Sequence, residues 1–312
     1  MAKDVARISV IIPTFMREEL LCQCLMDVLQ QTYAQFETIV VDQTAQHKPE
    51  TEVFLRSLLD RIRYIRLDRP SVTAACNEGA RVASGSILVF LDDDVRISDR
   101  EFLHKHAACY GDLSVGAVAG RVQDPRHPGG VPYDPRSLDP VWGWSYTGWD
   151  HHTHADVVTI PGANMSCRKN LFIQLGGFDE CFTGNAVRFE NDFCLRMRTA
   201  GFRVIFDPAA EVVHHYDSEG GHNNRHLYGT SEESHAWYVS YFRNMVYVTV
   251  KHIPMRVWPL ACWNLWRQHV FNRPFLQIGL PFVFARQCVF VRGVWQGLLA
   301  GRRATGHGAH NK

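Results

Sequence analysis

The stretch SILVFLDDD, residues 86–94, constrains the fold of this chain more than any other. Its consecutive apolar residues, rich in branched and aromatic types, predict a strand buried on both faces. A packed core does not accept three adjacent carboxylates, so the strand must end there and deliver them to a solvent-filled cleft. Ligands of α/β proteins bind at the carboxyl edge of parallel strands, where crowded carboxylates can be held by a divalent cation. The stretch therefore predicts a metal site, with an acidic turn or a helix cap as the alternative.

The residues around this strand alternate between apolar runs typical of strands and amphipathic runs typical of helices. Strands are expected at residues 8–12, 36–41 and 62–67, and helices at 18–29, 51–60 and 71–83. This alternation, completed by the acidic strand, predicts a parallel sheet wound in the right-handed sense. The predicted fold class is α/β, with a mostly parallel, Rossmann-like sheet flanked by helices.

The regular alternation ends near residue 100. Beyond it we expect helices at 101–110, 168–175 and 192–200, and strands at 115–122, 202–206 and 211–214. Residues 124–155 contain five prolines and have the character of a long loop. A loop of this length inside a compact domain is more often a binding element or a lid than a linker.

Charge is unevenly distributed along the chain. The formal net charge is +1, but no acidic residue follows Glu233, whereas residues 234–312 hold ten Lys or Arg. The acidic first part suits a metal-dependent site and argues against a nucleic-acid-binding protein. The nine cysteines lack paired metal-type spacing, which favours a reduced, cytoplasmic compartment. The N-terminal residues MAKDVARISV do not have the apolar core of a signal peptide.

Eight short motifs follow one another along residues 8–216. They are SVIIPTFMRE (9–18), IVVD (39–42), NEG with ASG (77–79 and 83–85), DDD (92–94), GANM (162–165), GGFDE (176–180), ENDFCLR (190–196) and VH (213–214). In this order they resemble glycosyltransferase family 2, the inverting, nucleotide-sugar-dependent transferases with the GT-A fold. Each motif alone is weak, and their order makes the resemblance specific.

The resemblance implies a glycosyltransferase of the hexosyltransferase class that uses a UDP- or dTDP-sugar, with Mg²⁺ or Mn²⁺ neutralising the diphosphate leaving group. Asp94 is expected as the first metal ligand, and Asp92 meets the ribose or shares the metal. His214 is expected near the metal, unless the adjacent His215 faces the site instead. Asp93 is expected to point away, as alternate residues on a strand edge do. The residues expected to line the nucleotide are Pro13, Thr14, Phe15, Arg17, Asp42, Asn77 and Asp92, with Asp42 accepting a hydrogen bond from the pyrimidine ring.

Inversion at the anomeric carbon needs a general base that takes the proton of the acceptor hydroxyl. The Glu-Asp pair usual in the family falls here on Phe189 and Glu190, so Glu190 takes the position of the base. Asp192 is the second candidate; alternatively, it is a helix-start residue favoured by the macrodipole. The loop aromatics either stack on acceptor sugar rings or pack the lid; they are Trp142, Trp144 and Trp149.

The last part of the chain is predicted as a helical extension, residues 231–312, beyond a catalytic domain of residues 1–230. That domain comprises a nucleotide-binding half (1–100) and an acceptor half (101–230). Aromatic residues interleaved with arginine suit the headgroup region of an anionic membrane, whereas the longest apolar stretch, 275–285, is too short to span one. We therefore expect a peripheral protein at the inner face of the cell membrane, acting on a glycan or lipid-linked acceptor. The alternatives are helices packed on the catalytic domain or an oligomer interface, and residues 301–312 are expected to be disordered.

Two other functions stay open at this point. A sugar nucleotidyltransferase would want a glycine-rich basic loop after the first strand, where this chain has Pro13-Thr14-Phe15. A non-catalytic nucleotide- or glycan-binding scaffold is disfavoured by the presence of Asp92, Asp94 and Glu190.

Overall fold

The structure is a computed structural model that describes residues 6–125, 149–184, 186–215 and 231–308. These residues fall into two compact units. The first contains the described residues up to 179 together with 193–215, and the second contains 180–192 together with 231–308.

The first unit is built on a single mixed sheet. Its strands are β1 (Ile8–Thr14), β2 (Phe36–Asp42), β3 (Ile62–Arg66), β4 (Ile87–Leu91), β5 (Val95–Arg96), β6 (Val115–Gln123), β7 (Ala155–Asp156), β8 (Asn164–Arg168) and β9 (Arg203–His214). Their order is β3-β2-β1-β4-β8-β6-β9-β5, with β7 paired to β9. Strands β3, β2, β1 and β4 are parallel, whereas β8 is antiparallel to both β4 and β6. The predicted α/β class is confirmed, and the antiparallel pairings are confined to the second half of the sheet.

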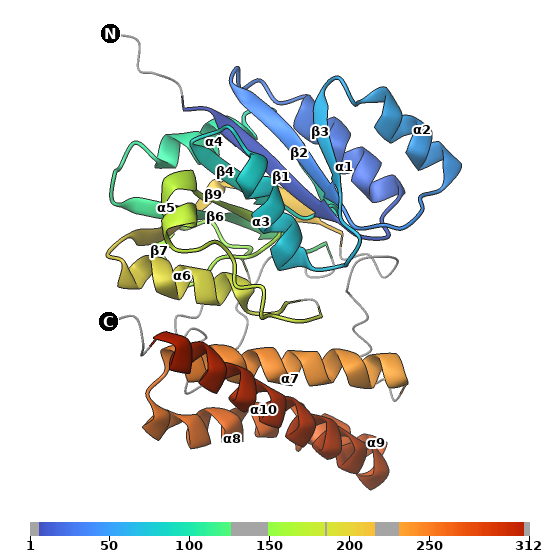
Figure 1. The fold of residues 1–312 in the computed structure, drawn as a ribbon, viewed down its shortest axis with the longest axis vertical. Helices are drawn as coiled ribbons and strands as arrows, with labels where there is room; N and C mark the ends of the chain where they lie inside the picture. Colours follow the sequence, from blue (N-terminus) through green and yellow to red (C-terminus); the bar gives the residue numbers. More distant parts are fainter. Residues whose placement is uncertain (1–5, 126–148, 185, 216–230, 309–312) are drawn as a thin grey trace. The chain divides into compact units, whose positions relative to one another are not determined.

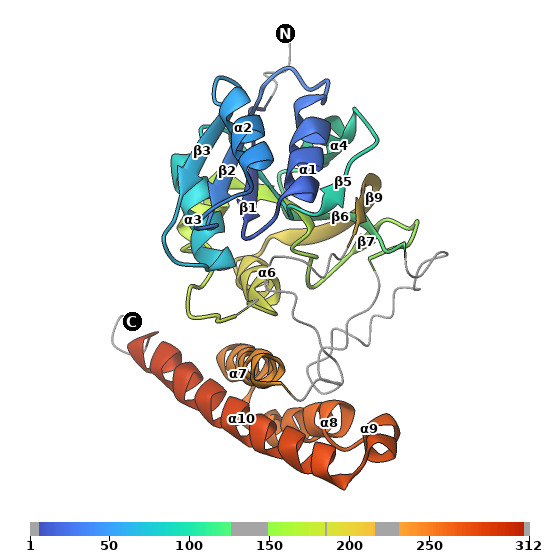
Figure 2. The ribbon, with the colours of Figure 1, turned by 90° about the vertical axis from the view of Figure 1, so that its right-hand side faces the viewer.

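Helices cover both faces of this sheet. They are α1 (Glu19–Leu29), α2 (Pro49–Ser57), α3 (Val72–Val82), α4 (Phe102–Cys109), α5 (Lys169–Gln174) and α6 (Phe189–Thr199), of which residues 189–192 group with the second unit. Helices α1 and α4 lie on one face and α3 on the other (Figures 1 and 2). A Cβ on Gly79 of α3 would lie 2.5 Å from Cγ2 of Ile11 in β1. The glycine of the NEG motif therefore allows a close helix–sheet contact.

The parallel strands deliver polar residues to one edge of the sheet. All residues of β1 and β4 are buried, as their apolar sequences predict. The register pairs Thr14 at the end of β1 with Asp42 at the end of β2. Because parallel strands end at a common edge, these two residues and the acidic turn after Leu91 lie together there.

Two strands differ from the sequence expectation. Strand β8 has no apolar run, because it contains the polar residues Asn164 and Ser166. These residues can be buried because their side chains form hydrogen bonds with His106, at 3.0 and 2.9 Å. Strand β9 is one element where two were expected. Its pairing with β6 shifts register between Asp207 and Glu211, so the intervening residues, which include Pro208, interrupt the apolar pattern.

The second unit contains the helices α7 (Glu232–His252), α8 (Trp258–His269), α9 (Arg273–Ile278) and α10 (Leu280–Gly308), with a 3₁₀ turn at Met255–Val257. The hydroxyl of Ser231 accepts a hydrogen bond from the Ser234 amide and caps α7, as predicted. Helices α7 and α10 lie side by side (Figures 1 and 2).

Three glycines of α10 allow this close approach. A Cβ at Gly293, Gly297 or Gly301 would lie 2.6, 2.6 or 2.4 Å from an atom of α7. The helix continues to Gly308, although residues 301–312 were expected to be disordered. Over the described residues, no helix combines the length and the hydropathy needed to cross a membrane.

Candidate active site

Two carboxylates of the acidic turn after β4 contact the imidazole of His214. One of them is half-exposed and the other is buried. The side chain of Asp92 is 39% exposed, whereas that of Asp94 is 2% exposed. Nε2 of His214 lies 3.3 Å from Oδ2 of Asp92 and 3.2 Å from Oδ1 of Asp94. The other oxygen of Asp94 accepts a hydrogen bond of 2.9 Å from Nη2 of Arg17.

Strand pairing explains how His214 reaches this turn. Val95 in β5 pairs with His214 in β9, next to the acidic residues. The neighbouring His215 is exposed, and its backbone amide donates to the carbonyl of Asp94 at 3.0 Å. Of the two adjacent histidines, His214 therefore faces the carboxylates, a choice that the sequence left open.

Asp92, Asp94 and His214 form a group that fits a divalent cation. One ligand atom from each residue lies within 4.8 Å of the other two. Carboxylate oxygens with an imidazole nitrogen are a suitable donor set for Mn²⁺, and the oxygens also suit Mg²⁺. Burial alone would lower the pKa of His214, but the hydrogen bond with Asp92 and the charge of Asp94 raise it above its ordinary value.

The expectation that Asp93 points away from the site is wrong. It is buried, and its two oxygens accept hydrogen bonds from Oγ1 of Thr14 at 2.6 Å and Nε of Arg17 at 3.3 Å. Burial and the charge of Asp94 raise the pKa of Asp93 to about 7. Side chains alternate only within a regular strand, and β4 ends at Leu91, so the rule does not apply to the turn. Thr14, at the end of β1, and Arg17, in the loop that follows β1, therefore hold the acidic turn in place.

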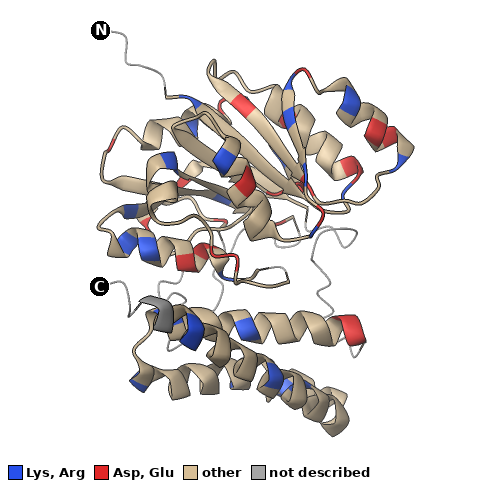
Figure 3. Ribbon diagram, viewed as in Figure 1, with Lys and Arg blue, Asp and Glu red and all other residues tan. Residues whose placement is uncertain are grey.

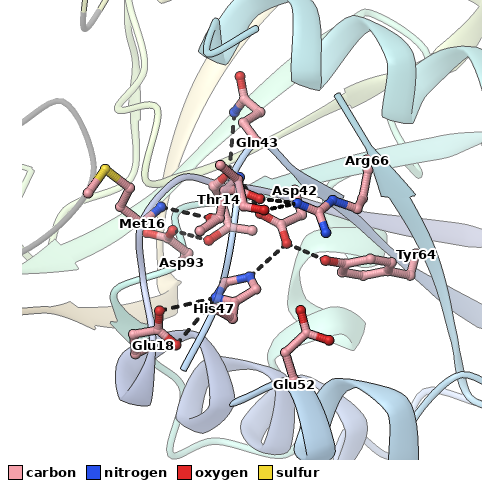
Figure 4. A network of polar contacts seen from close by, with 12 residues as sticks. Thr14, Met16, Glu18, Asp42, Gln43, His47, Glu52, Tyr64, Arg66 and Asp93 are labelled. Atoms are coloured by element: carbon pink, nitrogen blue, oxygen red, sulfur yellow. Dashed lines mark hydrogen bonds and ion pairs between the residues drawn. The ribbon is translucent and has the colours of Figure 1, made fainter. Parts of the chain in front are cut away.

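Asp42 ends β2 and is fully buried in a polar network (Figure 4). Its Oδ2 accepts hydrogen bonds from Nε2 of His47, at 2.7 Å, and from the hydroxyl of Tyr64, and its Oδ1 accepts from the Thr44 amide at 2.7 Å. Burial alone would raise the pKa of Asp42, but these hydrogen bonds bring it below the ordinary value. Both oxygens of Asp42 already accept hydrogen bonds. A nucleotide base could therefore replace these interactions with its own only if one of the present partners moved.

His47 is a residue of this network that sequence reasoning did not select. Its Nδ1 lies 3.3 Å from both carboxylate oxygens of Glu18, next to the start of α1 (Figure 4). The imidazole thus lies between two carboxylates, and the hydrogen bond with Asp42 raises its pKa. The only signal in the sequence was a histidine five residues after the strand-end Asp42.

Replacement of His47 by Gln is expected to lower stability most at acidic pH. A histidine with a raised pKa contributes its full stability below the unfolded value of about 6.5 and loses it as the pH rises through the folded value. Hydrogen bonds to charged groups contribute about 1.5–3 kcal/mol, so we expect the free energy of unfolding to fall by this amount at about pH 5. Urea unfolding of both proteins between about pH 5 and pH 9 measures the difference.

His104→Gln is the matched control, because His104 is 46% exposed and lies 3.7 Å from Glu101 at the surface. It should change stability little at any pH. A difference between wild type and His47→Gln that is constant, or that grows toward alkaline pH, would contradict this account.

Asn77 connects two of the sequence motifs. Its side-chain amide donates to the carbonyl of Phe178 at 2.8 Å and accepts from the amide of the same residue at 2.9 Å. The NEG motif is thereby joined to GGFDE. Of the other residues expected around the nucleotide, Pro13 is buried within β1 and Phe15 is half-buried in the following loop.

The expected acceptor aromatics are only partly described. Trp142 and Trp144 lie outside the described residues. Trp149 is 5% exposed, and its ring centroid lies 6.1 Å from that of Phe206. These contacts favour the packing alternative for Trp149.

The two candidate bases lie in the first turn of α6 and differ in accessibility. Asp192 is fully buried, with Nζ of Lys251 at 2.6 Å and Nε2 of His252 at 2.8 Å from its Oδ1. Glu190 is half-buried. The carboxylate of Asp192 is therefore enclosed and engaged by two side chains of α7, whereas Glu190 is partly exposed.

Proteins with solved structures share this arrangement of elements. The mannosyltransferase PcManGT from Pyrobaculum calidifontis, solved with GDP-Man and Mn²⁺, aligns with a TM-score of 0.56 and 18% identity over 94% of this chain and 87% of that one. GalNAc-T7, solved with UDP, GalNAc and Mn²⁺, aligns with a TM-score of 0.61 and 14% identity over 96% of this chain and 58% of that one. The fold is that of the GT-A glycosyltransferases.

The chain belongs to glycosyl transferase family 2, whose family model matches residues 9–175. It is 27% identical over 226 residues to the O-antigen biosynthesis protein RfbC of Myxococcus xanthus, covering 67% of this chain and 17% of that protein. It is 29% identical over 141 residues to the putative colanic acid biosynthesis glycosyl transferase WcaA of Escherichia coli K12, covering 42% of this chain and 49% of that protein. The matched region therefore spans less than half the length of either relative. The family predicted from the motifs is confirmed.

Proposed function

We propose that this protein is a metal-dependent inverting glycosyltransferase that moves a sugar from a UDP- or dTDP-sugar to a glycan or lipid-linked acceptor. The observation that carries the proposal is the group of Asp92, Asp94 and His214 at the carboxyl edge of the sheet. The two similar structures were solved with Mn²⁺, which supports the proposal. The names of the relatives, which refer to O-antigen and colanic acid, support a role in the assembly of surface polysaccharide or glycolipid.

Each part of the site has a role in this proposal. A divalent cation on Asp92, Asp94 and His214 would supply Lewis-acid stabilisation of the diphosphate leaving group. Arg17 and Thr14 keep the acidic turn in place through Asp93 and Asp94. Asp42 and its partners order the loop after β2 for the nucleotide, and Pro13, Phe15 and Asn77 are the further residues assigned to nucleotide binding. Glu190 accepts the proton of the acceptor hydroxyl.

A donor screen tests this function. UDP-, dTDP- and GDP-sugars are incubated with the protein and Mg²⁺, Mn²⁺ or EDTA, and the released nucleotide is measured. We expect metal-stimulated release from a UDP- or dTDP-sugar, and a transfer product of inverted anomeric configuration. Release that is unchanged by EDTA would contradict the metal requirement, and retention of configuration would contradict the inverting mechanism.

The second unit has a surface that suits an anionic membrane. Its large apolar side chains that are more than half exposed are Met255, Trp263, Leu280, Phe284, Val291 and Trp295. Exposed arginines occur on the same part of the chain, at Arg256, Arg267, Arg273, Arg292, Arg302 and Arg303. Figure 3 shows basic and no acidic residues on α8, α9 and α10. We propose that this surface holds the protein at the inner face of the cell membrane.

Binding to liposomes is expected to combine two contributions. Each Lys or Arg near an anionic surface contributes about 1 kcal/mol, and this attraction is screened over about 10 Å at 0.1 M salt. Inserted aromatic side chains should resist salt, because their contribution is apolar. Sedimentation should therefore show strong binding to anionic liposomes, partial release at high salt and weak binding to neutral liposomes.

The double variant Phe284→Ala/Trp295→Ala should lose the salt-resistant fraction. Leu113→Ala is the control, since Leu113 is 80% exposed on the first unit. A full-length protein that ignores anionic liposomes and elutes as an oligomer would assign this surface to an interface between copies instead.

A further inference from the structure

The segment that carries Glu190 has an unusual backbone. Gly184, Ala186 and Arg188 have positive φ angles of 64°, 50° and 79°. Two of them carry side chains, for which this conformation is unfavourable. Such residues persist only where the surrounding structure holds them, and they are found at functional sites more often than elsewhere. The described residues around Glu190 must therefore be held by contacts with the surrounding structure.

Asn244 in the middle of α7 holds the beginning of this segment. It is fully buried, its Oδ1 accepts a hydrogen bond from the Thr183 amide at 3.2 Å, and its Nδ2 donates to the Thr183 carbonyl at 2.8 Å. Nη1 of Arg243 donates to the same Oδ1 at 2.9 Å. A buried asparagine is costly in a helix unless its amide is paired, so its pairing with Thr183 accounts for its presence in α7.

Helix α7 also holds the end of the segment. The carboxylate of Asp192, two residues after Glu190, lies against Lys251 and His252. Between these points, Nε of Arg188 lies 3.2 Å from Sδ of Met245, and the rings of Phe182 and Tyr247 have centroids 5.2 Å apart.

The contacting positions of α7 define one face of the helix. Tyr247, Lys251 and His252 follow Asn244 by three, seven and eight residues, as expected for neighbours along a helical face, and Met245 is next to Asn244. Contacts with Thr183 and Asp192 come before and after Glu190 in the chain. The position of Glu190 within this unit is thereby tied to α7.

We propose that α7 is the positioning element of the general base, with Asn244 and the Lys251–His252 pair as positioning residues that act through Glu190. This inference rests on the proposed role of Glu190. Proton transfer requires the base within hydrogen-bond reach of its substrate, and a misplacement of about 1 Å can lower a rate by about 10²-fold. Loosening residues 181–192 should therefore slow turnover and leave nucleotide binding by the first unit unchanged.

The test compares Asn244→Ala with Val250→Ala. Val250 is buried on the same helix but contacts Gly301 of α10, so its variant controls for a general loss of packing in α7. The probes are UDP affinity measured calorimetrically with Mn²⁺, and UDP release from UDP-glucose, UDP-galactose and UDP-GlcNAc. Asn244→Ala should lower the turnover number by about 10²-fold at unchanged UDP affinity. Val250→Ala should lower the melting temperature at least as much and keep most of the turnover.

A double-mutant cycle separates positioning from ordinary stabilisation. If Asn244 acts through Glu190, then Asn244→Ala should have almost no further effect in a Glu190→Gln background. Additive effects would overturn the inference while leaving the base assignment intact. Full activity of Glu190→Gln would overturn the base assignment, and the inference with it. His252→Gln, tested in the same cycle, takes the place of Asn244→Ala if that variant does not fold.

Discussion

Replacement of Asp94 by Asn should abolish metal-stimulated transfer. Asp94 contributes a buried oxygen to the proposed metal group and accepts a hydrogen bond from Arg17, so an amide of the same shape removes a ligand charge at the centre of the site. Lewis-acid stabilisation contributes several kcal/mol to a transition state, and each ~1.4 kcal/mol changes a rate about tenfold. We expect turnover to fall by about 10³-fold or more, with loss of Mn²⁺ binding in calorimetric titrations that contain UDP.

Asp93→Asn is the matched control for this variant. Asp93 lies in the same turn and pairs with the same Arg17, but it is not part of the group of possible metal ligands. Both variants disturb a buried ion pair, so both should lower the melting temperature, whereas Asp93→Asn should keep Mn²⁺ binding. Retained Mn²⁺ affinity in Asp94→Asn, or an equal loss in both variants, would remove Asp94 from the metal site.

Replacement of Glu190 by Gln should separate chemistry from donor binding. The amide keeps the shape of the side chain but cannot take a proton, and removal of a general base lowers rates by about 10²–10⁴-fold. We expect the turnover number to fall within this range, while the affinity for the nucleotide-sugar changes little. Steady-state kinetics and calorimetry on the same preparation measure the two quantities.

Asp192→Asn tests the alternative alignment of the base. Because Asp192 is buried against Lys251 and His252, its variant should lose stability as well as rate. A selective loss of turnover in Asp192→Asn, together with normal turnover in Glu190→Gln, would show that the base lies two residues further along the chain.

The strands and helices of the first half were predictable because their patterns are local. The apolar runs of β1, β2 and β4 fix both the element type and the end of each strand, which placed Asp42 and Asp92 correctly at the sheet edge. Strand β8 was not predictable in this way, since its buried polar residues are satisfied by His106, about sixty residues earlier in the chain.

The parts of the site that sequence reasoning missed depend on contacts between distant residues. Asp93 is held by Thr14 and Arg17, more than 70 residues away, and a strand-edge rule cannot reveal such a contact. The domain boundary expected at residue 230 stays a prediction. Residues 180–192 group with the C-terminal helices, and side chains of α7, such as Asn244, pair with them.

The glycines of α10 determine where the chain can change its length. Gly293, Gly297 and Gly301 recur at every fourth residue and meet α7 without side chains. An insertion of one residue inside this row would rotate the later glycines by about 100° around the helix and press a side chain against α7. An insertion or deletion in the connection between α7 and α10, residues 253–279, would leave the row intact. The register of α10 against α7 is therefore set by this row, whereas the connection contacts α7 through other side chains, such as His269 on Tyr241.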